Sequence, residues 1–133
     1  MQTFLPYPDF KKSARTLDWK RLGRQRVEAY QILRTLSGLS AGWRSHPAVR
    51  MWAGYELALS AYMNDMIEEW LRRGYRNNMY TVALDPGYPL PPWLGDPAFH
   101  RAHRSNLIRK DPAYYRRFWP ALSDDLPYVW PLP

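Results

Sequence analysis

The sequence of 133 residues contains no cysteine, and it has no apolar run long enough to cross a bilayer. Without cysteine there is no disulfide framework, no thiolate nucleophile and no zinc site built on sulfur. A membrane-spanning helix needs about 18 consecutive apolar residues, and residues 1–6 lack the basic and apolar regions of a secretion signal. We therefore expect a cytoplasmic protein with no membrane partner.

The common catalytic motifs are also missing. The sequence contains no GxGxxG, no P-loop, no HExxH and no GxSxG motif. Histidine is scarce, since only His46, His100 and His103 are present. A three-histidine metal site would need all of them to converge, so we expect no metal. His100 and His103, three residues apart on one predicted helix, are expected to face solvent or phosphate.

Apolar and aromatic residues are abundant. Hydrophobic residues make up 46% of the chain and aromatic residues 16%, which is enough to form a core and excludes disorder for most of the chain. Helical signals dominate: Asp18 is a good N-cap, Gly38 a good stop, and Ser45 a cap before Pro47. The predicted helices span residues 18–37, 45–73, 96–111 and, as a short turn, 114–117.

These signals predict an all-α fold. We expect one compact domain over residues 1–133, with about three main helices. Pro6 and Pro8 keep the first eight residues extended as an N-terminal arm. Residues 75–96 are expected to form an ordered loop, because they contain several Pro-rich turns and no periodicity. The segment after Pro120, rich in proline and aromatic residues, is expected to wrap around the body.

Positive charge is in excess. Nineteen Lys and Arg residues, fifteen of them Arg, face twelve Asp and Glu residues, which gives a net charge of +7. Six cations lie in residues 101–117 and eight in residues 11–34, whereas residues 56–69 carry four acids and no cation. Such a basic, aromatic-rich chain favours a nucleic-acid partner. Two solvated helix faces would give the same pattern, which leaves that alternative open.

The first predicted helix has two faces. Its apolar stripe consists of Trp19, Leu22, Ala29, Leu33 and Leu36. A second face carries Arg21, Arg24, Gln25 and Glu28, at spacings that place them together. Gly23, inside this helix, costs about 1 kcal/mol relative to Ala. Such a glycine is typical of a close approach by another helix or by a ligand backbone.

Two other segments have distinctive patterns: one is typical of a core, and the other suits a nucleic-acid contact. The stripe Trp52, Tyr55, Leu59, Tyr62, Met66 and Trp70 of the second predicted helix is typical of a core. After Pro112, aromatic residues alternate with cations: Tyr114, Tyr115, Arg116, Arg117 and Trp119. That pattern suits an opened nucleic-acid strand. For Tyr114 and Tyr115, stacking on bases and filling the core are equally open.

Three blocks of the sequence resemble the pyrimidine dimer DNA glycosylase (endonuclease V) family. Residues 17–28, LDWKRLGRQRVE, resemble its first basic helix. Residues 46–75, from His46 to LRRGY, resemble its long central helix and the turn that follows. Residues 103–115, with His103, SNL, Lys110, Pro112 and two tyrosines, resemble its third helix and the aromatic-basic stretch beyond. The blocks occur in the family's order and cover about two-thirds of the chain.

The resemblance implies a function and a mechanism. Members of this family are DNA glycosylases with abasic-site lyase activity, in which the N-terminal α-amine attacks the anomeric carbon of a flipped nucleotide. Because Gln2 is too bulky for ordinary removal of the initiator methionine, the nucleophile here would be the Met1 amine. The implied partner is double-stranded DNA with a damaged or modified base. No organic cofactor and no metal is implied, and we expect a monomer.

The resemblance also implies site residues. An alignment without gaps places Gly23 where the family has its catalytic carboxylate, so Glu28 becomes the candidate. Two alternatives remain: an i, i+4 ion pair of Glu28 with Arg24, or Asp18 as the carboxylate. The predicted nucleic-acid contacts are Arg21, Arg24, Gln25, Arg26, His46, Arg104, Lys110, Tyr114, Tyr115 and Arg117. For Arg26 a buried structural role remains open, and His46 is equally well placed to cap a helix.

Two other functions stay open at this point. On the same scaffold the chain would be a non-catalytic DNA- or RNA-binding protein if the family's carboxylate had been lost at Gly23. An enzyme of this fold that acts on a modified base or on RNA is the third possibility. The sequence does not identify the base lesion, because the shape of the binding pocket decides it.

Overall fold

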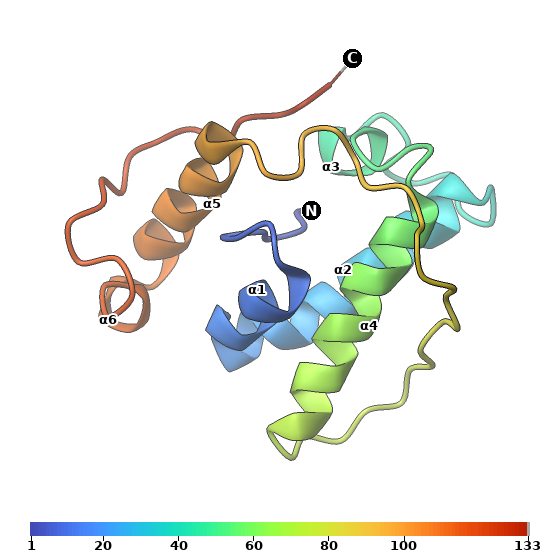
Figure 1. Cartoon of the computed structure of the whole chain (residues 1–133), viewed down its shortest axis with the longest axis horizontal. Coiled ribbons are helices and arrows are strands. Elements are labelled where there is room, and N and C mark those ends of the chain that lie inside the picture. Colours follow the sequence, from blue (N-terminus) through green and yellow to red (C-terminus); the bar gives the residue numbers. More distant parts are fainter. Residues whose placement is uncertain (133) are drawn as a thin grey trace.

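The computed structural model describes residues 1–132, and their regular secondary structure is α-helix (Figure 1). No strand occurs among these residues, so the prediction of an all-α fold is confirmed. The helices are α1 (Phe10–Thr16), α2 (Trp19–Leu36), α3 (Pro47–Arg50), α4 (Glu56–Arg72), α5 (Pro97–Lys110) and α6 (Pro112–Tyr115). In the described part of the chain, no helix is long and apolar enough to span a membrane.

Aspartate caps and glycine stops define the helix ends. Four helices begin after an aspartate whose side chain accepts a backbone N–H of the first turn: Asp9, Asp18, Asp96 and Asp111. Gly38 and Gly74, with φ of 82° and 89°, follow the ends of α2 and α4 in a conformation that glycine adopts without strain. The predicted helices at residues 18–37 and 96–111 are therefore confirmed, as is the absence of helix from 75 to 96. The short turn of helix predicted for residues 114–117 is present two residues earlier, as α6.

Two predictions about the helices were wrong. The single helix predicted for residues 45–73 is two helices, because Gly54 (φ 86°) and Tyr55 (φ −125°, ψ 38°) interrupt it. His46 rather than Ser45 caps α3, with Nδ1 accepting the Ala48 N–H. The short helix α1 was not predicted, although Asp9 is a cap of the same kind as Asp18.

The core lies between α2 and α4, which pack along each other, with α1 against α4. Leu22, Ala29 and Ile32 of α2 are fully buried, and so are Leu59, Tyr62 and Met66 of α4, which confirms the predicted α4 stripe. Trp19 was placed in the core incorrectly, since it is 54% exposed. Gln25, predicted on the polar face of this helix, is buried instead.

Gly23 allows α4 to approach α2 closely. A Cβ atom at Gly23 would lie 2.9 Å from Cζ3 of Trp70, closer than side chains pack. The close approach of another helix, predicted for Gly23, is therefore confirmed. The contact with the Trp70 ring offsets the cost of a glycine inside α2. The same geometry leaves no room for a carboxylate side chain at position 23.

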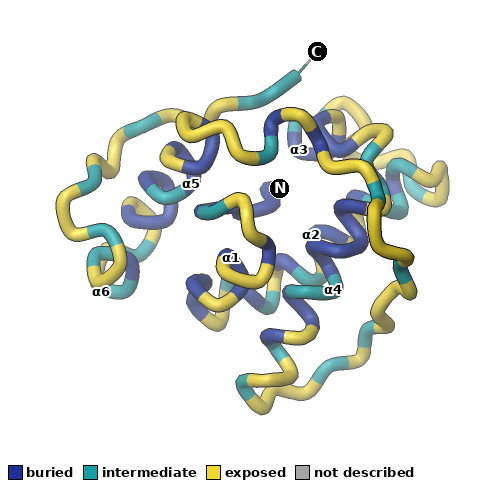
Figure 2. Tube along the Cα trace, viewed as in Figure 1, coloured by how far each residue is buried: buried dark blue, intermediate teal, exposed yellow. Residues whose placement is uncertain are grey.

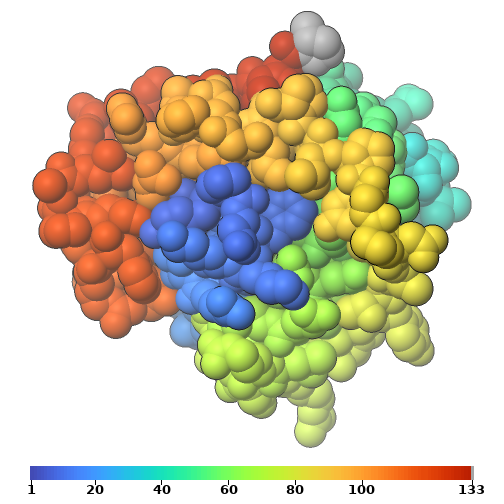
Figure 3. Space-filling view, in the orientation of Figure 1, coloured from blue at the N-terminus to red at the C-terminus, as the bar shows by residue number. Residues whose placement is uncertain are grey.

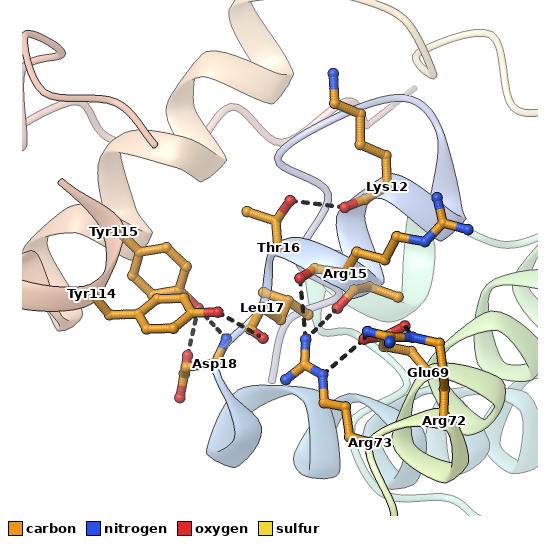
Figure 4. Close-up of polar contacts among 11 residues, drawn as sticks. Lys12, Arg15, Thr16, Leu17, Asp18, Glu69, Arg72, Arg73, Tyr114 and Tyr115 are labelled. Atoms are coloured by element: carbon orange, nitrogen blue, oxygen red, sulfur yellow. Dashed lines mark hydrogen bonds and ion pairs between the residues drawn. The ribbon is translucent and has the colours of Figure 1, made fainter. Parts of the chain in front are cut away.

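Figure 4 shows the polar contacts that fix the junction of α1 and α2. Arg73, at the end of α4, binds Glu69 at 2.8 Å and the carbonyl oxygens of Ala14 and Arg15 at 3.2 and 3.1 Å. Burial alone would raise the pKa of Glu69, but hydrogen bonds and charges from Arg72 and Arg73 lower it below its usual value. The hydrogen bonds from Arg73 to the two carbonyl oxygens tie the end of α1 to the end of α4, and the ion pair with Glu69 holds the guanidinium group in place.

The C-terminal segment wraps the body, as predicted. Leu126 donates its N–H to Ser105 Oγ at 3.0 Å and accepts a hydrogen bond from Asn106 Nδ2 at 3.0 Å, so the segment is pinned to α5. Further on, the ring of Trp130 packs edge-on against His46, with 5.9 Å between the centroids. The C-terminal segment therefore reaches from α5 to the start of α3.

Candidate active site

The N-terminal arm runs through the interior of the protein rather than over its surface. Residues 2–6 are buried, whereas Met1 is partly exposed (Figure 2). In Figure 1 the arm passes between α5 on one side and the α2–α4 pair on the other. In Figure 3 the blue N-terminal part of the chain fills the middle of one face, between the green and the orange parts. Since the arm has no secondary structure, side chains must satisfy its buried backbone groups.

Gln25 binds the arm on both sides of Thr3. Its Nε2 donates to the carbonyl oxygen of Gln2 at 3.0 Å, and its Oε1 accepts the N–H of Phe4 at 2.9 Å. The hydroxyl of Tyr62 lies 2.8 Å from the carbonyl oxygen of Phe4. Because Gln25 is only 2% exposed, it is placed to hold the arm rather than to contact DNA.

The two histidines of α5 hold the next part of the arm. The prediction that they face solvent or phosphate was wrong, because both are buried. His103 Nδ1 accepts the N–H of Leu5 at 2.9 Å, while His100 Nδ1 lies 2.8 Å from the carbonyl oxygen of Leu5. Since His100 Nε2 accepts the N–H of Gly95 at 2.9 Å, the proton of His100 is assigned to Nδ1. Both rings are therefore neutral and bind one residue of the arm from opposite sides.

This arrangement predicts loss of stability in mild acid. Burial lowers the pKa of His103 to about 3, and burial also lowers that of His100. Between pH 6.5 and pH 3 the unfolded chain binds protons that the folded chain excludes, so the free energy of unfolding falls as the pH falls. His103 alone accounts for a slope of up to about 1.4 kcal/mol per pH unit, measurable by denaturant unfolding between pH 7 and pH 5.

A matched variant isolates the contribution of His103. His103→Asn keeps an acceptor for the Leu5 N–H but has no proton to bind, so its unfolding free energy should depend less steeply on pH. An equally steep dependence in both proteins would show that the His103 ring is not responsible.

Glu28 lies beside the start of the arm. Its Oε2 accepts the N–H of Gln2 at 3.1 Å and a hydrogen bond from Gln25 Nε2 at 3.3 Å. Its Oε1 lies 3.5 Å from Nη2 of Arg24, an exposed side chain. The Glu28 side chain is 15% exposed, so the carboxylate remains open to solvent on one side. The carbonyl carbon of Met1 is the one atom between the bound Gln2 nitrogen and the α-carbon that carries the amine.

The structure contains both alternatives to a catalytic Glu28, the ion pair with Arg24 and the carboxylate of Asp18. The ion pair between Glu28 and Arg24 is present, but it uses Oε1 and leaves Oε2 with the arm. Asp18 caps α2, pairs with Arg21 at 3.1 Å and binds the Tyr115 hydroxyl. It lies ten residues before Glu28, about 15 Å away along the helix axis. Burial alone would raise the pKa of Asp18, yet hydrogen bonds from Tyr115 and Arg21 lower it. These contacts support a structural role for Asp18 as the cap of α2.

His46 completes this group of residues. Burial lowers its pKa, and the charge of the N-terminal ammonium group lowers it further, while Glu28 acts in the opposite direction. The imidazole therefore lies within electrostatic reach of both the amine and the carboxylate. Because Nδ1 caps α3, Nε2 is the nitrogen left to carry the proton. Capping, one of the two roles expected of His46, thus fixes the ring's orientation.

A family model for pyrimidine dimer DNA glycosylases matches residues 1–81. The match covers more than half of the chain and includes the arm, Gln25, Glu28 and His46. The chain belongs to the pyrimidine dimer DNA glycosylase family. No curated protein and no solved structure matches it. Family membership implies a repair function of the DNA glycosylase type and a DNA substrate with pyrimidine dimers. Within residues 1–132, no group of three or more His, Cys, Asp or Glu side chains is arranged to hold a metal ion.

Of the arginines predicted as DNA contacts, three are partly buried and bound to other parts of the protein. Arg26 donates to Asn77 at 2.6 Å and lies 4.4 Å from the centroid of the Trp70 ring, and burial lowers its pKa. Arg104 donates to the carbonyl oxygen of Pro6 at 2.8 Å, and burial lowers its pKa too. Arg21 pairs with Asp18. These contacts support structural roles for the three arginines, and Arg104 stabilises the arm.

The aromatic pair after Pro112 divides between core and surface. Tyr115 is fully buried, accepts the N–H of Asp18 at 3.0 Å and donates to the Asp18 carboxylate (Figure 4). Its burial supports the core interpretation. Tyr114 is partly exposed, and the exposed Arg117 lies over its ring, 4.5 Å from the centroid.

Two grooves on the surface of α2 meet at Trp19 and Lys20, which line both. The first, of about 420 Å³, extends over Gly23 and Trp70 to Glu28. The second, of about 570 Å³, reaches Lys110 and Tyr114. It therefore brings the basic stretches of α2 and α5 together on one surface. A larger apolar groove of about 860 Å³ lies between α2, α4 and residues 78–82, and it contains none of the predicted site residues.

Sequence reasoning missed three residues of these grooves. Trp19 had been placed in the core, and Lys20 and Tyr75 had no assigned role. A tryptophan directly after an N-cap occupies the first turn of its helix, where the end of the helix can be free of neighbours. The place of Trp19 in the first turn of α2 was therefore the signal in the sequence that it could be exposed.

Proposed function

We propose that this family member excises a damaged pyrimidine from double-stranded DNA, with the Met1 α-amine as nucleophile, and then cleaves the abasic strand as a lyase. The observation that carries the proposal is the hydrogen bond from the Gln2 N–H to Glu28 Oε2, at 3.1 Å. It holds the first residues of the arm next to a carboxylate that is still open to solvent. Side chains of α2, α4 and α5 fix the rest of the arm, so the amine is preorganised for attack.

The chemistry follows from these positions. The lone pair of the uncharged amine attacks C1′ of the flipped nucleotide, and the glycosidic bond breaks with its electron pair leaving on the base, which takes up a proton. The nitrogen loses one proton, and the sugar ring opens as the bond between C1′ and O4′ breaks and O4′ takes up a proton, which leaves a protonated Schiff base. Removal of a proton from C2′ then breaks the bond between C3′ and its phosphate oxygen, and water hydrolyses the Schiff base to restore the amine.

Glu28 is proposed as the group that accepts these protons and stabilises the cationic intermediate. No residue in this scheme requires a metal, an organic cofactor or a second copy of the chain, so we propose that the protein acts as a monomer without a cofactor.

The proposed DNA contacts are the exposed side chains near the two grooves. Arg24 is one of them, with a side chain that is 78% exposed. Lys110 and Arg117 are exposed as well, and Tyr114 lies beside them. Arg21, Arg26, His46 and Arg104 are proposed to support this surface and the arm.

Binding of the DNA backbone should depend strongly on salt. With about five phosphate contacts, the logarithm of the association constant should fall linearly with the logarithm of the salt concentration, with a slope of about −4 to −5. Lys110→Gln should weaken binding and flatten the slope by about one unit. Lys11→Gln is the control, because Lys11 pairs with Asp65 at 3.1 Å and with Glu68 at 3.5 Å. A slope near zero in the unaltered protein would contradict the proposal that exposed Lys and Arg side chains bind the DNA backbone.

The function itself is tested by strand cleavage. Three duplexes of one sequence, undamaged, with a single pyrimidine dimer, and with an abasic site, should be incubated with the protein and resolved on a denaturing gel. We expect cleavage of the dimer-containing and abasic strands at the altered position and none of the undamaged duplex. Binding to all three without cleavage would refute catalysis and support a non-catalytic DNA-binding protein on the same scaffold.

A further inference from the structure

Aromatic rings from α2, from α4 and from the turn after α4 form a stack at the surface. The rings of Trp70 and Tyr75 lie 4.3 Å apart with an angle of 31° between their planes. Trp19 continues the stack beyond Tyr75, with centroids 6.5 Å apart and an angle of 36°. Trp19 is 54% exposed and Tyr75 is 38% exposed. The outer part of the stack thus presents aromatic faces to solvent.

The inner end of this stack is firmly held. The Trp70 Nε1 donates to the carbonyl oxygen of Arg76 at 2.8 Å, and the guanidinium of Arg26 covers the ring at 4.4 Å. Gly23 gives the ring its space against α2. Because these contacts fix Trp70, the position of Tyr75 against it is fixed as well. The exposed rings are therefore available in one arrangement, which lowers the cost of binding a planar group.

The stack lies where the two grooves meet. Trp19 lines the groove that reaches Glu28, and together with Tyr75 it lines the groove that reaches Lys110. Lys20 lines both grooves, with its ammonium 5.7 Å from the Trp19 ring. Among residues 1–132, neither Lys20 nor Lys110 forms an ion pair, so both charges are available to an anion.

Exposed aromatic rings between uncompensated cations match the chemistry of single-stranded DNA. Bases stack on aromatic side chains irrespective of their sequence, while cations follow the phosphates. A paired duplex offers no free base face to Trp19, whereas a strand opened next to a flipped nucleotide does. The direct path from Glu28 to Trp19 along one groove places such a strand within reach.

We propose that Trp19 and Tyr75 form a stacking site for an unpaired base of the DNA strand next to the reacting nucleotide, with Lys20 and Lys110 at the adjoining phosphates. This inference rests on the proposed function and extends it, because it gives the protein a preference for locally opened DNA. It also assigns a role to the exposed Trp19, which the reaction chemistry does not use.

The test compares binding to two undamaged DNAs that differ only in pairing. One is a continuous duplex, and the other has three unpaired nucleotides at its centre; dissociation constants are measured by fluorescence anisotropy at one salt concentration. The unaltered protein should bind the opened DNA more tightly. Trp19→Leu, which keeps an apolar side chain without an aromatic face, should lose about 5- to 150-fold in affinity for the opened DNA, and Trp19→Phe should lose less.

Tyr80→Ala is the matched control, because Tyr80 is 92% exposed and lines the apolar groove instead. It should bind both DNAs as the unaltered protein does. Equal affinity of the unaltered protein for the two DNAs would overturn the proposal, and so would equal losses in Trp19→Phe and Trp19→Leu. Neither DNA contains a lesion and only binding is measured, so the outcome is independent of whether the protein cleaves damaged DNA. Thermal melting of each variant confirms that it is folded.

Discussion

Extension of the chain by two residues before Met1 should abolish strand cleavage and leave DNA binding almost unchanged. The added residues move the free α-amine away from Glu28 and convert the Met1 nitrogen into an amide, whose lone pair is delocalised and no longer nucleophilic. The hydrogen bond between Gln2 and Glu28 remains possible, so the arm stays in place. Cleavage of an abasic duplex and anisotropy-based affinity, measured on the same preparation, separate the two effects.

A reversible extension provides the control. A protease site that leaves Met1 as the first residue after digestion should restore cleavage in the same sample, which excludes misfolding as the cause of the loss. If the extended protein cleaved the abasic duplex at the normal rate, the Met1 amine would be excluded as the nucleophile.

Replacement of Glu28 by Gln should slow cleavage by about 10²–10⁴-fold, the usual size of an acid–base contribution. Glutamine keeps the shape of the side chain and an acceptor for the Gln2 N–H, but it can neither take up a proton nor stabilise a cation by its charge. Single-turnover cleavage of an abasic duplex at saturating protein measures this step without a contribution from binding.

The competing explanation, in which Glu28 serves only as an ion-pair partner, predicts a different result. Loss of an exposed i, i+4 pair costs about 0.3–0.5 kcal/mol of stability and leaves turnover near normal. Arg24→Gln removes the same pair and keeps the carboxylate. Equal single-turnover rates for Glu28→Gln and Arg24→Gln at saturating protein would refute the catalytic assignment of Glu28.

The helices of this fold could be predicted from local signals, since caps and stops act within a few residues. Asp18 with Gly38, and Asp96 with Pro97, define α2 and α5 in the sequence as they do in the structure. The break before α4 depends on Gly54 and Tyr55. An apolar periodicity that continues across such a break conceals it, which is why one long helix was expected.

The candidate site could be predicted only in part, because the arm occupies the core. Polar residues such as Gln25, His100 and His103 normally indicate a surface, but here they satisfy the buried backbone of an extended segment. Leu5 and His103 are 98 residues apart in the sequence, so no local pattern connects them. Trp19 belongs to the apolar stripe of α2 and is nevertheless exposed, so apolar spacing alone does not identify the buried side of this helix.

Borohydride trapping tests the central claim most directly. Borohydride reduces a Schiff base to a stable amine, so incubation with an abasic duplex should leave a covalent protein–DNA adduct. We predict that peptide mapping of this adduct finds the DNA fragment on the α-amine of Met1 and on no lysine. An adduct at a lysine such as Lys20, or no adduct with either the abasic or the dimer-containing duplex, would contradict the account.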